Sequence, residues 1–221
     1  MAIKPILFNT EMVRAILDGR KSCTRRLVSS RQFLGMLPDK CKNAAPDEFL
    51  KGKRMMFKPY CDMTDAELIM TAYKAPYQPG DILYVRETWK KAPNGYYYYE
   101  SWQRSYIADI TKWHPSIHMP KEAARIWLKV TDVRVERLQD ITEEQACMEG
   151  TDPWDEACYE NNGWHPTFSD PDSGGDPNMI DGFHKLWNFT IKKSDIDRYG
   201  WDANPWVWVI EFERCDKPEE V

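Results

Sequence analysis

Apolar positions recur along this chain at two spacings, which separate predicted strands from predicted helices. Short apolar or alternating runs predict strands at residues 4–8, 24–28, 82–89, 123–138 and 205–212. Spacings of three and four predict helices near 12–17 and 179–191, the first capped by Asn9 or Thr10 and ended by Gly19. Thr142 with Gln145 predicts the cap of a third helix that closes at Glu149-Gly150. Since strands do not alternate regularly with helices, the pattern favours an α+β fold over a doubly wound sheet.

The middle of the chain predicts a β-hairpin. Gln78-Pro79-Gly80-Asp81 is a turn signal ahead of the strand at 82–89, and Pro93-Asn94-Gly95 is a second turn. Tyr96 to Tyr99 and the aromatic run 102–107 follow as the returning strand. We expect the tyrosines to be buried alternately rather than to form a stacking surface. In the long strand, the alternation slips near Thr131-Asp132, which predicts a bulge or two separate strands.

Two stretches lose this regularity. Residues 29–77 carry several prolines and a basic run, and residues 151–177 are acidic and rich in Gly, Pro and Asp. Stretches this long without a clear period are usually functional or irregular. We therefore predict one domain over residues 1–214 with insertions at about 29–77 and 151–177, followed by a polar tail at 215–221.

Charge is distributed unevenly along the 221 residues, whose formal net charge is −5. Residues 20–58 hold eleven Lys and Arg against three acids, whereas residues 139–190 hold twelve acids against one Lys. This asymmetry indicates either a polarised surface with a basic, anion-binding side or simply two solvated faces. Aromatic residues make up 13% of the chain, which suits a packed core and also base stacking.

Several classes of protein are excluded by what the sequence lacks. No apolar run approaches the roughly 18–20 residues of a membrane helix, and the first residues carry no apolar signal region, so we predict a cytoplasmic protein without a membrane partner. Six cysteines are scattered without a C-x-x-C pair, and four histidines lack the spacing of a zinc finger. We predict neither a metal nor a cofactor.

The stretch Gly19-Arg20-Lys21-Ser22-Cys23-Thr24-Arg25-Arg26 is the strongest candidate for chemistry. It places a lysine, small nucleophilic side chains and arginines at the corner between the first predicted helix and the second predicted strand. On a regular strand, positions three apart point to opposite faces, so Lys21 and Thr24 share a side only if this corner is a turn. A cationic corner with hydroxyl groups suits a polar ligand better than a core.

Four segments together resemble the ASCH domain family of the PUA-like superfamily. They are the helix with Gly19 to Arg26, the strand Gly80 to Trp89, the segment Val133 to Gly150 and the terminal Trp206 to Phe212. The longer form, with Pro115 to Pro120 and Asn204 to Trp208, looks like ASCH proteins carried by bacteriophages and prophages. The resemblance implies a small mixed β-barrel flanked by helices, with a central cleft.

The same resemblance implies a link to RNA or modified nucleosides. Some compact bacterial members of the family are amidohydrolases that remove acetyl from N4-acetylcytidine. Their Lys, the Thr three residues later and a helical Glu match Lys21, Thr24 and Glu149 of this sequence. Two departures from the family are Ser22 and Cys23, which replace the usual Thr and aliphatic residue. The two insertions also make this chain longer than the compact enzymes.

The three matched residues allow two divisions of labour. The pKa of a lysine amine is normally about 10.4, so Lys21 acts as the base for Thr24 only if its surroundings favour the neutral amine. Glu149 would then protonate the leaving nitrogen or orient the base. Alternatively, Lys21 stays a cation that stabilises negative charge, and Glu149 is the base. A plainer interpretation is an ordinary Lys21–Glu149 ion pair and a Thr24 that only begins a strand.

Further residues are candidates for substrate or nucleic-acid binding: Arg20, Arg25, Arg26, Arg86, Glu87 and His118. Arginines near a turn suit phosphate contacts, and the strand 82–89 would form a wall of the cleft. They keep a second hypothesis open, a binding module for RNA or a modified base without catalysis. A ribonuclease-like activity is a third, and weaker because neither a His pair nor a metal cluster is evident.

Overall fold

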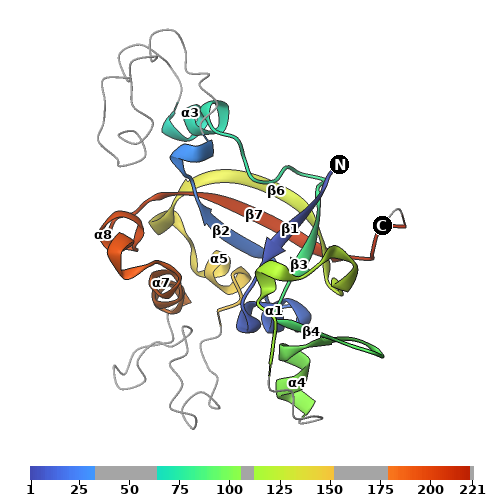
Figure 1. Ribbon diagram of the computed structural model, residues 1–221. Helices are drawn as coiled ribbons and strands as arrows, with labels where there is room; N and C mark the ends of the chain where they lie inside the picture. Colours follow the sequence, from blue (N-terminus) through green and yellow to red (C-terminus); the bar gives the residue numbers. More distant parts are fainter. Residues whose placement is uncertain (33–63, 106–111, 152–178, 220–221) are drawn as a thin grey trace, which may run out of the picture. The chain divides into compact units, whose positions relative to one another are not determined.

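The computed structural model describes residues 1–32, 64–105, 112–151 and 179–219. Five strands of these residues form a mixed sheet in the order β1-β3-β6-β7-β2 (Figure 1). β1 (Ile3–Leu7) runs parallel to β3 (Ile82–Arg86), and β3 runs antiparallel to β6 (Trp127–Arg137). β7 (Trp206–Cys215) and β2 (Cys23–Leu27) complete the sheet, while β4 (Trp89–Ala92) and β5 (Gly95–Tyr98) form a separate hairpin.

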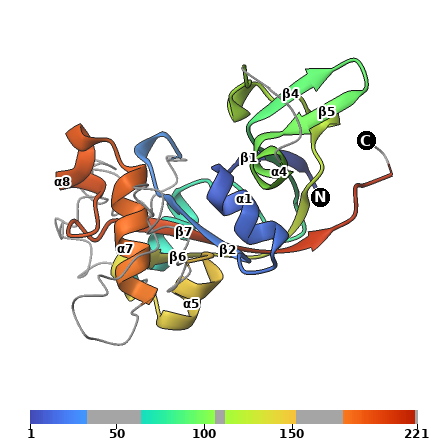
Figure 2. The same cartoon turned by 90° about the horizontal axis from the view of Figure 1, so that it is seen from below.

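The described residues also form six α-helices and five short 3-10 turns (Figures 1 and 2). The helices are α1 (Thr10–Leu17), α3 (Asp65–Ala72), α4 (Tyr99–Ser105), α5 (Glu143–Met148), α7 (Met179–Thr190) and α8 (Ile196–Tyr199). The 3-10 turns are η1 (Ser30–Gln32), η3 (Ser116–His118), η4 (Lys121–Ala123), η5 (Leu138–Asp140) and η7 (Lys193–Asp195). The predicted α+β class is therefore confirmed.

Helices α1 and α5 begin and end where the sequence signals predict. The Asn9 side chain accepts a hydrogen bond from the Met12 N–H at 2.8 Å, and α1 closes at Gly19, whose φ of 79° suits glycine. Thr142 and Gln145 form the reciprocal capping box of α5, each side chain accepting from the other's backbone N–H.

Two sequence predictions about local structure were wrong. The strand predicted at 82–89 ends at Arg86, and Trp89 already belongs to the hairpin. The run after Tyr98 forms helix α4 instead of extending the hairpin. The physical reason is the three-residue spacing of Tyr99 and Trp102, which lets their rings stack 5.6 Å apart on one helical face.

The predicted small β-barrel is matched only at the coarser level of a mixed sheet. Among the described strands the order is open, with β1 and β2 at its two ends, so these strands do not close a ring. β6 is one continuous strand whose burial pattern changes phase at Thr131-Asp132, as the slip in the sequence predicted: Leu128 and Val130 are buried before it and Val133 and Val135 after it.

The chain divides into two compact units. Unit 1 consists of residues 1–22, 77–132 and 211–221, and unit 2 of residues 23–76 and 133–210. The prediction of one domain with two insertions stays a prediction, since most of both insertions lies outside the described residues. Within the described part of the chain, no helix is long and apolar enough to cross a membrane.

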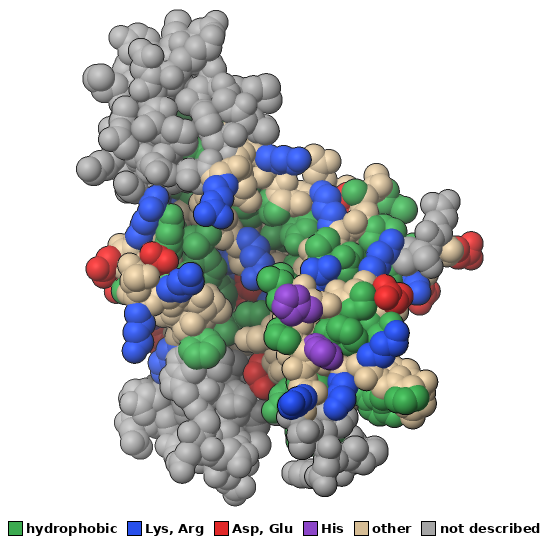
Figure 3. Space-filling view, viewed as in Figure 1, with side chains coloured by type: hydrophobic (Ala, Val, Ile, Leu, Met, Phe, Trp, Pro, Cys, Tyr) green, Lys and Arg blue, Asp and Glu red, His purple; other side chains and the backbone are tan. Residues whose placement is uncertain are grey.

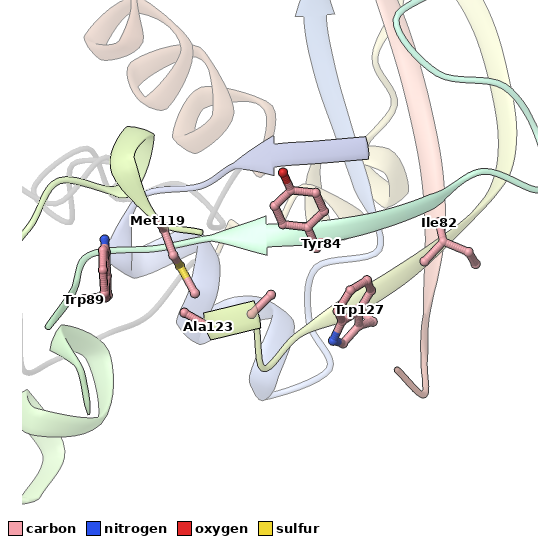
Figure 4. Packing of buried hydrophobic residues seen from close by; sticks show 7 residues of the cluster. Ile82, Tyr84, Trp89, Met119, Ala123 and Trp127 are labelled. Atoms are coloured by element: carbon pink, nitrogen blue, oxygen red, sulfur yellow. The ribbon is translucent and has the colours of Figure 1, made fainter. Parts of the chain in front are cut away.

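The core of unit 1 contains a cluster of large apolar side chains (Figure 4). Its members are Ile82, Tyr84, Trp89, Met119, Ala123, Ala124 and Trp127. Tyr96 and Tyr98 of β5 pack against it, whereas Tyr97 points the other way and is 36% exposed. This confirms the alternate burial that we expected of the tyrosine run.

The core of unit 2 contains the first half of β7. Trp206 and Trp208 are both buried, and the Trp208 indole N–H donates to the Gln32 side chain at 3.1 Å. Helix α5 packs against α7 and against β2. β2 and α5 are the elements that carry Thr24 and Glu149, and this packing decides which side chains around them meet.

Candidate functional site

Lys21 lies in unit 1, directly after α1. The backbone N–H groups of Arg20 and Lys21 both donate to the Ala15 carbonyl, at 2.8 and 3.0 Å, which closes the helix and fixes the start of the corner. The Lys21 side chain is only 3% exposed, and its ammonium lies 5.6 Å from the centre of the Phe8 ring. A buried lysine in contact with an aromatic face is uncommon in a protein core.

Thr24 and Arg25 lie side by side on β2 in unit 2, and both are buried. Consecutive residues of a strand point to opposite faces. Arg25 is the one that donates to Glu149, with 3.2 Å between its Nη1 and Glu149 Oε1. The Arg25 Nη2 donates to the side chains of Gln145 at 2.7 Å and Glu136 at 3.4 Å.

Glu149 is the residue that caps the C-terminal end of α5, and its side chain is 3% exposed. Gly150 follows with a φ of 84°, and the Thr151 hydroxyl donates to the Ala146 carbonyl at 2.6 Å. The glycine and this hydrogen bond fix the turn of the chain after Glu149. A carboxylate at this end of a helix gains nothing from the helix dipole. Its burial instead depends on cations, and Arg25 supplies one.

Arg25 has no exposed side-chain surface. Besides its three acceptors, its guanidinium lies 5.7 Å from the centre of the Phe183 ring of α7. The predicted contact between Arg25 and a nucleic acid would have to compete with these partners. Arg20 is exposed and lies 3.6 Å from Asp18, and Arg26 is half-buried on β2.

A second buried charge cluster lies in unit 1, around Glu87. Arg125 donates to both carboxylate oxygens of Glu87 at 2.8 Å, to Ser101 at 2.7 Å and to Glu100 at 3.3 Å. The Arg125 guanidinium also lies 4.2 Å from the centre of the Tyr98 ring. Burial raises the pKa of Glu87, although the hydrogen bonds from Arg125 act in the opposite direction.

Arg86 and His118, two further predicted site residues, come from neighbouring parts of unit 1. Arg86 ends β3 and donates to the Ile117 carbonyl at 3.2 Å and to the Tyr84 hydroxyl at 3.3 Å. Ile117 belongs to η3, the turn that also carries the exposed His118. Arg86 therefore holds this turn, while Glu87 points to Arg125 from the opposite face of the chain.

Sequence reasoning missed Arg125, Glu100, Glu136 and the second role of Gln145. Arg125 had a signal, since it is the one charge in the otherwise apolar run from Ala123 to Leu128, and buried charges are usually paired. Gln145 was recognised as a capping residue, but the same side-chain oxygen also accepts from Arg25. In the described part of the chain, no group of His, Cys, Asp and Glu has the arrangement of a metal site.

Comparisons of this chain with protein-family models, with curated proteins and with solved structures found no match. The resemblance to the ASCH family consequently depends on the motifs of the sequence alone.

Proposed function

We propose that this protein is an ASCH-type amidohydrolase that removes the acyl group from N4-acetylcytidine or a closely related N4-acylated cytidine. The observation that supports it most is burial. Eight polar or charged side chains are buried in the described residues, and Lys21, Thr24 and Glu149 are three of them, exposed by 3, 2 and 3%. Buried ionisable groups are costly unless they are paired or functional, and they gather at active sites.

The finer fold is part of the same proposal. The ASCH resemblance implies a small PUA-like barrel, and the mixed five-stranded sheet with helix α5 against β2 is compatible with its strand and helix content. In the sequence, the insertion at 151–177 follows the helix that Glu149 caps. The first insertion follows β2, the strand that carries Thr24.

In the proposed reaction, the Thr24 hydroxyl oxygen attacks the acyl carbonyl carbon of the substrate. The bond between this carbon and the exocyclic nitrogen breaks, the nitrogen takes up a proton and cytidine leaves. The acyl group remains as an ester on Thr24 until water attacks it, which releases the carboxylate and restores the hydroxyl. Lys21 and Glu149 move the protons and stabilise the negative charge of the carbonyl oxygen.

The decisive assay is the release of cytidine from N4-acetylcytidine, followed by chromatography. Thr24→Ala removes the nucleophile and lowers kcat/KM by roughly a thousandfold or more, as losses of catalytic nucleophiles do. Ser22→Ala is the matched control, because it removes a hydroxyl two residues away and leaves turnover unchanged. Cytidine release by Thr24→Ala at the rate of the unmodified protein, or its absence from the unmodified protein, would overturn the proposal.

The two possible divisions of labour between Lys21 and Glu149 give different results in the same assay. Lys21→Arg keeps a cation but cannot serve as a base near neutral pH. It therefore retains activity if Lys21 stabilises charge, and loses it if Lys21 takes the proton of Thr24. Glu149→Gln loses activity in both cases. Circular dichroism of each variant separates lost chemistry from lost folding.

A further inference from the structure

We propose that one face of the β4–β5 hairpin and the adjoining helix α4 binds single-stranded nucleic acid. The surface consists of one lysine and four aromatic residues of unit 1, which we call the hairpin platform: Lys90, Tyr97, Tyr99, Trp102 and Trp113. The inference deepens the proposed function, on which its link to a modified nucleoside rests. It extends the substrate from a free nucleoside to a nucleoside within a strand.

The strand register brings three of these residues to one face. Lys90 pairs with Tyr97 in the antiparallel hairpin. Trp89 forms an antiparallel bridge with His114, with backbone hydrogen bonds of 2.8 and 3.2 Å in the two directions. Side chains alternate between the two faces of an extended chain. Lys90 therefore points to the other face than its neighbour Trp89, and Trp113 to the other face than its neighbour His114. Trp113 consequently shares a face with Lys90 and Tyr97.

The remaining two rings extend this face onto α4. Tyr99 and Trp102 stack with an angle of 27° between their planes. Trp113 meets the Tyr99 ring edge-on at 5.3 Å and lies 5.8 Å from the Trp102 ring. All three rings are half-buried, so they hold each other in place and still offer surface to a ligand. Rigid, half-exposed rings are what bases stack on in proteins that bind single strands.

The charge around the platform suits a polyanion. Among the described residues of β4, β5, α4 and the bridging segment 112–114, the one carboxylate is Glu100, which is buried and pairs with Arg125. The same elements carry three lysines that are at least partly exposed. Lys90 lies on the platform itself, whereas Lys91 and Lys112 lie on the opposite face of the extended chain. Figure 3 shows Lys and Arg side chains in blue and His side chains in purple on one face of the molecule. This local positive charge contrasts with the net charge of −5 for the whole chain.

Stacking rings together with lysines select a single strand over a duplex. In a duplex, the faces of the bases are covered by their neighbours, and only phosphates would remain for the platform to contact. A single strand offers both its base faces to the rings and its phosphates to the lysines. RNA and DNA share this chemistry, so the experiment includes both.

The test is fluorescence anisotropy with labelled oligouridine, oligothymidine and a duplex, at two salt concentrations. We expect both single strands, or one of them, to bind more tightly than the duplex. Trp113→Ala should weaken this binding by roughly tenfold, since stacking contributes about 1–3 kcal/mol per base. Lys90→Glu should weaken it as well and reduce the salt slope by about one.

Lys193→Glu is the matched control, because it makes the same change of charge at an exposed position of unit 2. Equal losses for Lys193→Glu and Lys90→Glu would mean that only the net charge matters, and would overturn the proposal. Duplex binding as tight as single-strand binding, or no change for Trp113→Ala, would also overturn it. Binding requires no turnover, and Lys90→Glu should still hydrolyse free N4-acetylcytidine, so this inference and the proposed function fail separately.

Discussion

The fully buried guanidinium of Arg25 is the most constrained side chain around the proposed site. It holds Glu149 and Gln145 of α5, Glu136 of β6 and the Phe183 ring of α7, all within unit 2. Sequence analysis treated Arg25 as a possible ligand contact because it stands beside Arg26 in a cationic corner. Its neighbours instead give it the role of positioning the Glu149 carboxylate.

Replacement of Arg25 is expected to destabilise the protein strongly. Arg25→Ala leaves Glu149 and Glu136 without their shared cation, and the loss of one partner of a buried ion pair costs about 3–5 kcal/mol. Arg25→Lys keeps the charge but cannot reach three acceptors at once. Its free energy of unfolding should therefore lie between those of the unmodified protein and of Arg25→Ala. Urea unfolding followed by circular dichroism measures both free energies of unfolding.

The control for Arg25 is Lys129→Ala. Lys129 lies 3.5 Å from Glu213, and both side chains are more than half exposed. Exposed pairs of this kind contribute about 0–1 kcal/mol. If Arg25→Ala proved no more destabilising than Lys129→Ala, the role of Arg25 in holding α5 to β2 would be wrong.

At the scale of elements, the turn before β3 shows how a side chain joins two strands. The Asp81 carboxylate accepts from the Ala2 N–H at 2.9 Å, from the Lys4 ammonium at 2.6 Å and from the Gln78 N–H at 3.1 Å. Burial by itself would raise the pKa of Asp81, but these hydrogen bonds outweigh it and lower the pKa. The turn signal in the sequence predicted this bend, but it did not predict the hydrogen bonds that Asp81 accepts from Ala2 and Lys4.

Stability should therefore depend on the ionisation of Asp81. A carboxyl with a lowered pKa in the folded state stabilises the protein above its unfolded pKa of about 3.9, and this contribution is lost as the pH falls through the folded value. Asp81→Asn should cost about 1–3 kcal/mol at neutral pH and much less in strong acid. Unfolding measured from neutral pH to below pH 3, beside the exposed control Asp202→Asn, checks this. A cost that did not shrink in acid would contradict it.

Elements whose identity depends on local pattern were predictable, and those that depend on distant partners were not. The caps of α1 and α5, the alternation of β5 and the phase slip of β6 all follow from neighbouring residues. Helix α4 was mistaken for a strand because its aromatic residues have strand propensity. The rings of Tyr99 and Trp102 contact Trp113, which lies outside the helix and which local pattern does not connect to it. The partners of Glu87 and Glu149 lie 38 and 124 positions away, which no local pattern reveals.

At the scale of the whole molecule, each unit is assembled from separate stretches of the chain. Unit 1 needs residues from both ends and the middle, and its Phe8 ring lies 6.1 Å from the ring of Phe212. β6 and β7 each begin in one unit and end in the other. The sequence predicted the elements of this arrangement but not the division, because contact density is not encoded in periodicity.

Neither half of the chain should fold alone. A fragment of residues 1–132 lacks the end of β7 that completes unit 1, and residues 133–221 lack β2 with Arg25. We expect each fragment to show no cooperative thermal transition by circular dichroism, and the two to regain structure only when expressed together. A cooperative transition in either fragment by itself would contradict this, and the intact chain, melted under the same conditions, is the reference.

The position of residues 211–221 in unit 1 has a consequence for synthesis in the cell. Strand β1 and helix α1 share a unit with residues 211–221, which leave the ribosome much later than they do. Co-translational folding of unit 1 therefore cannot finish before residues 211–221 have left the ribosome, and the Lys21 side chain stays hydrated until then. Chains whose contacts span their whole length fold slowly and expose apolar surface meanwhile. The nascent chain should consequently depend on chaperones more than a chain whose contacts are local.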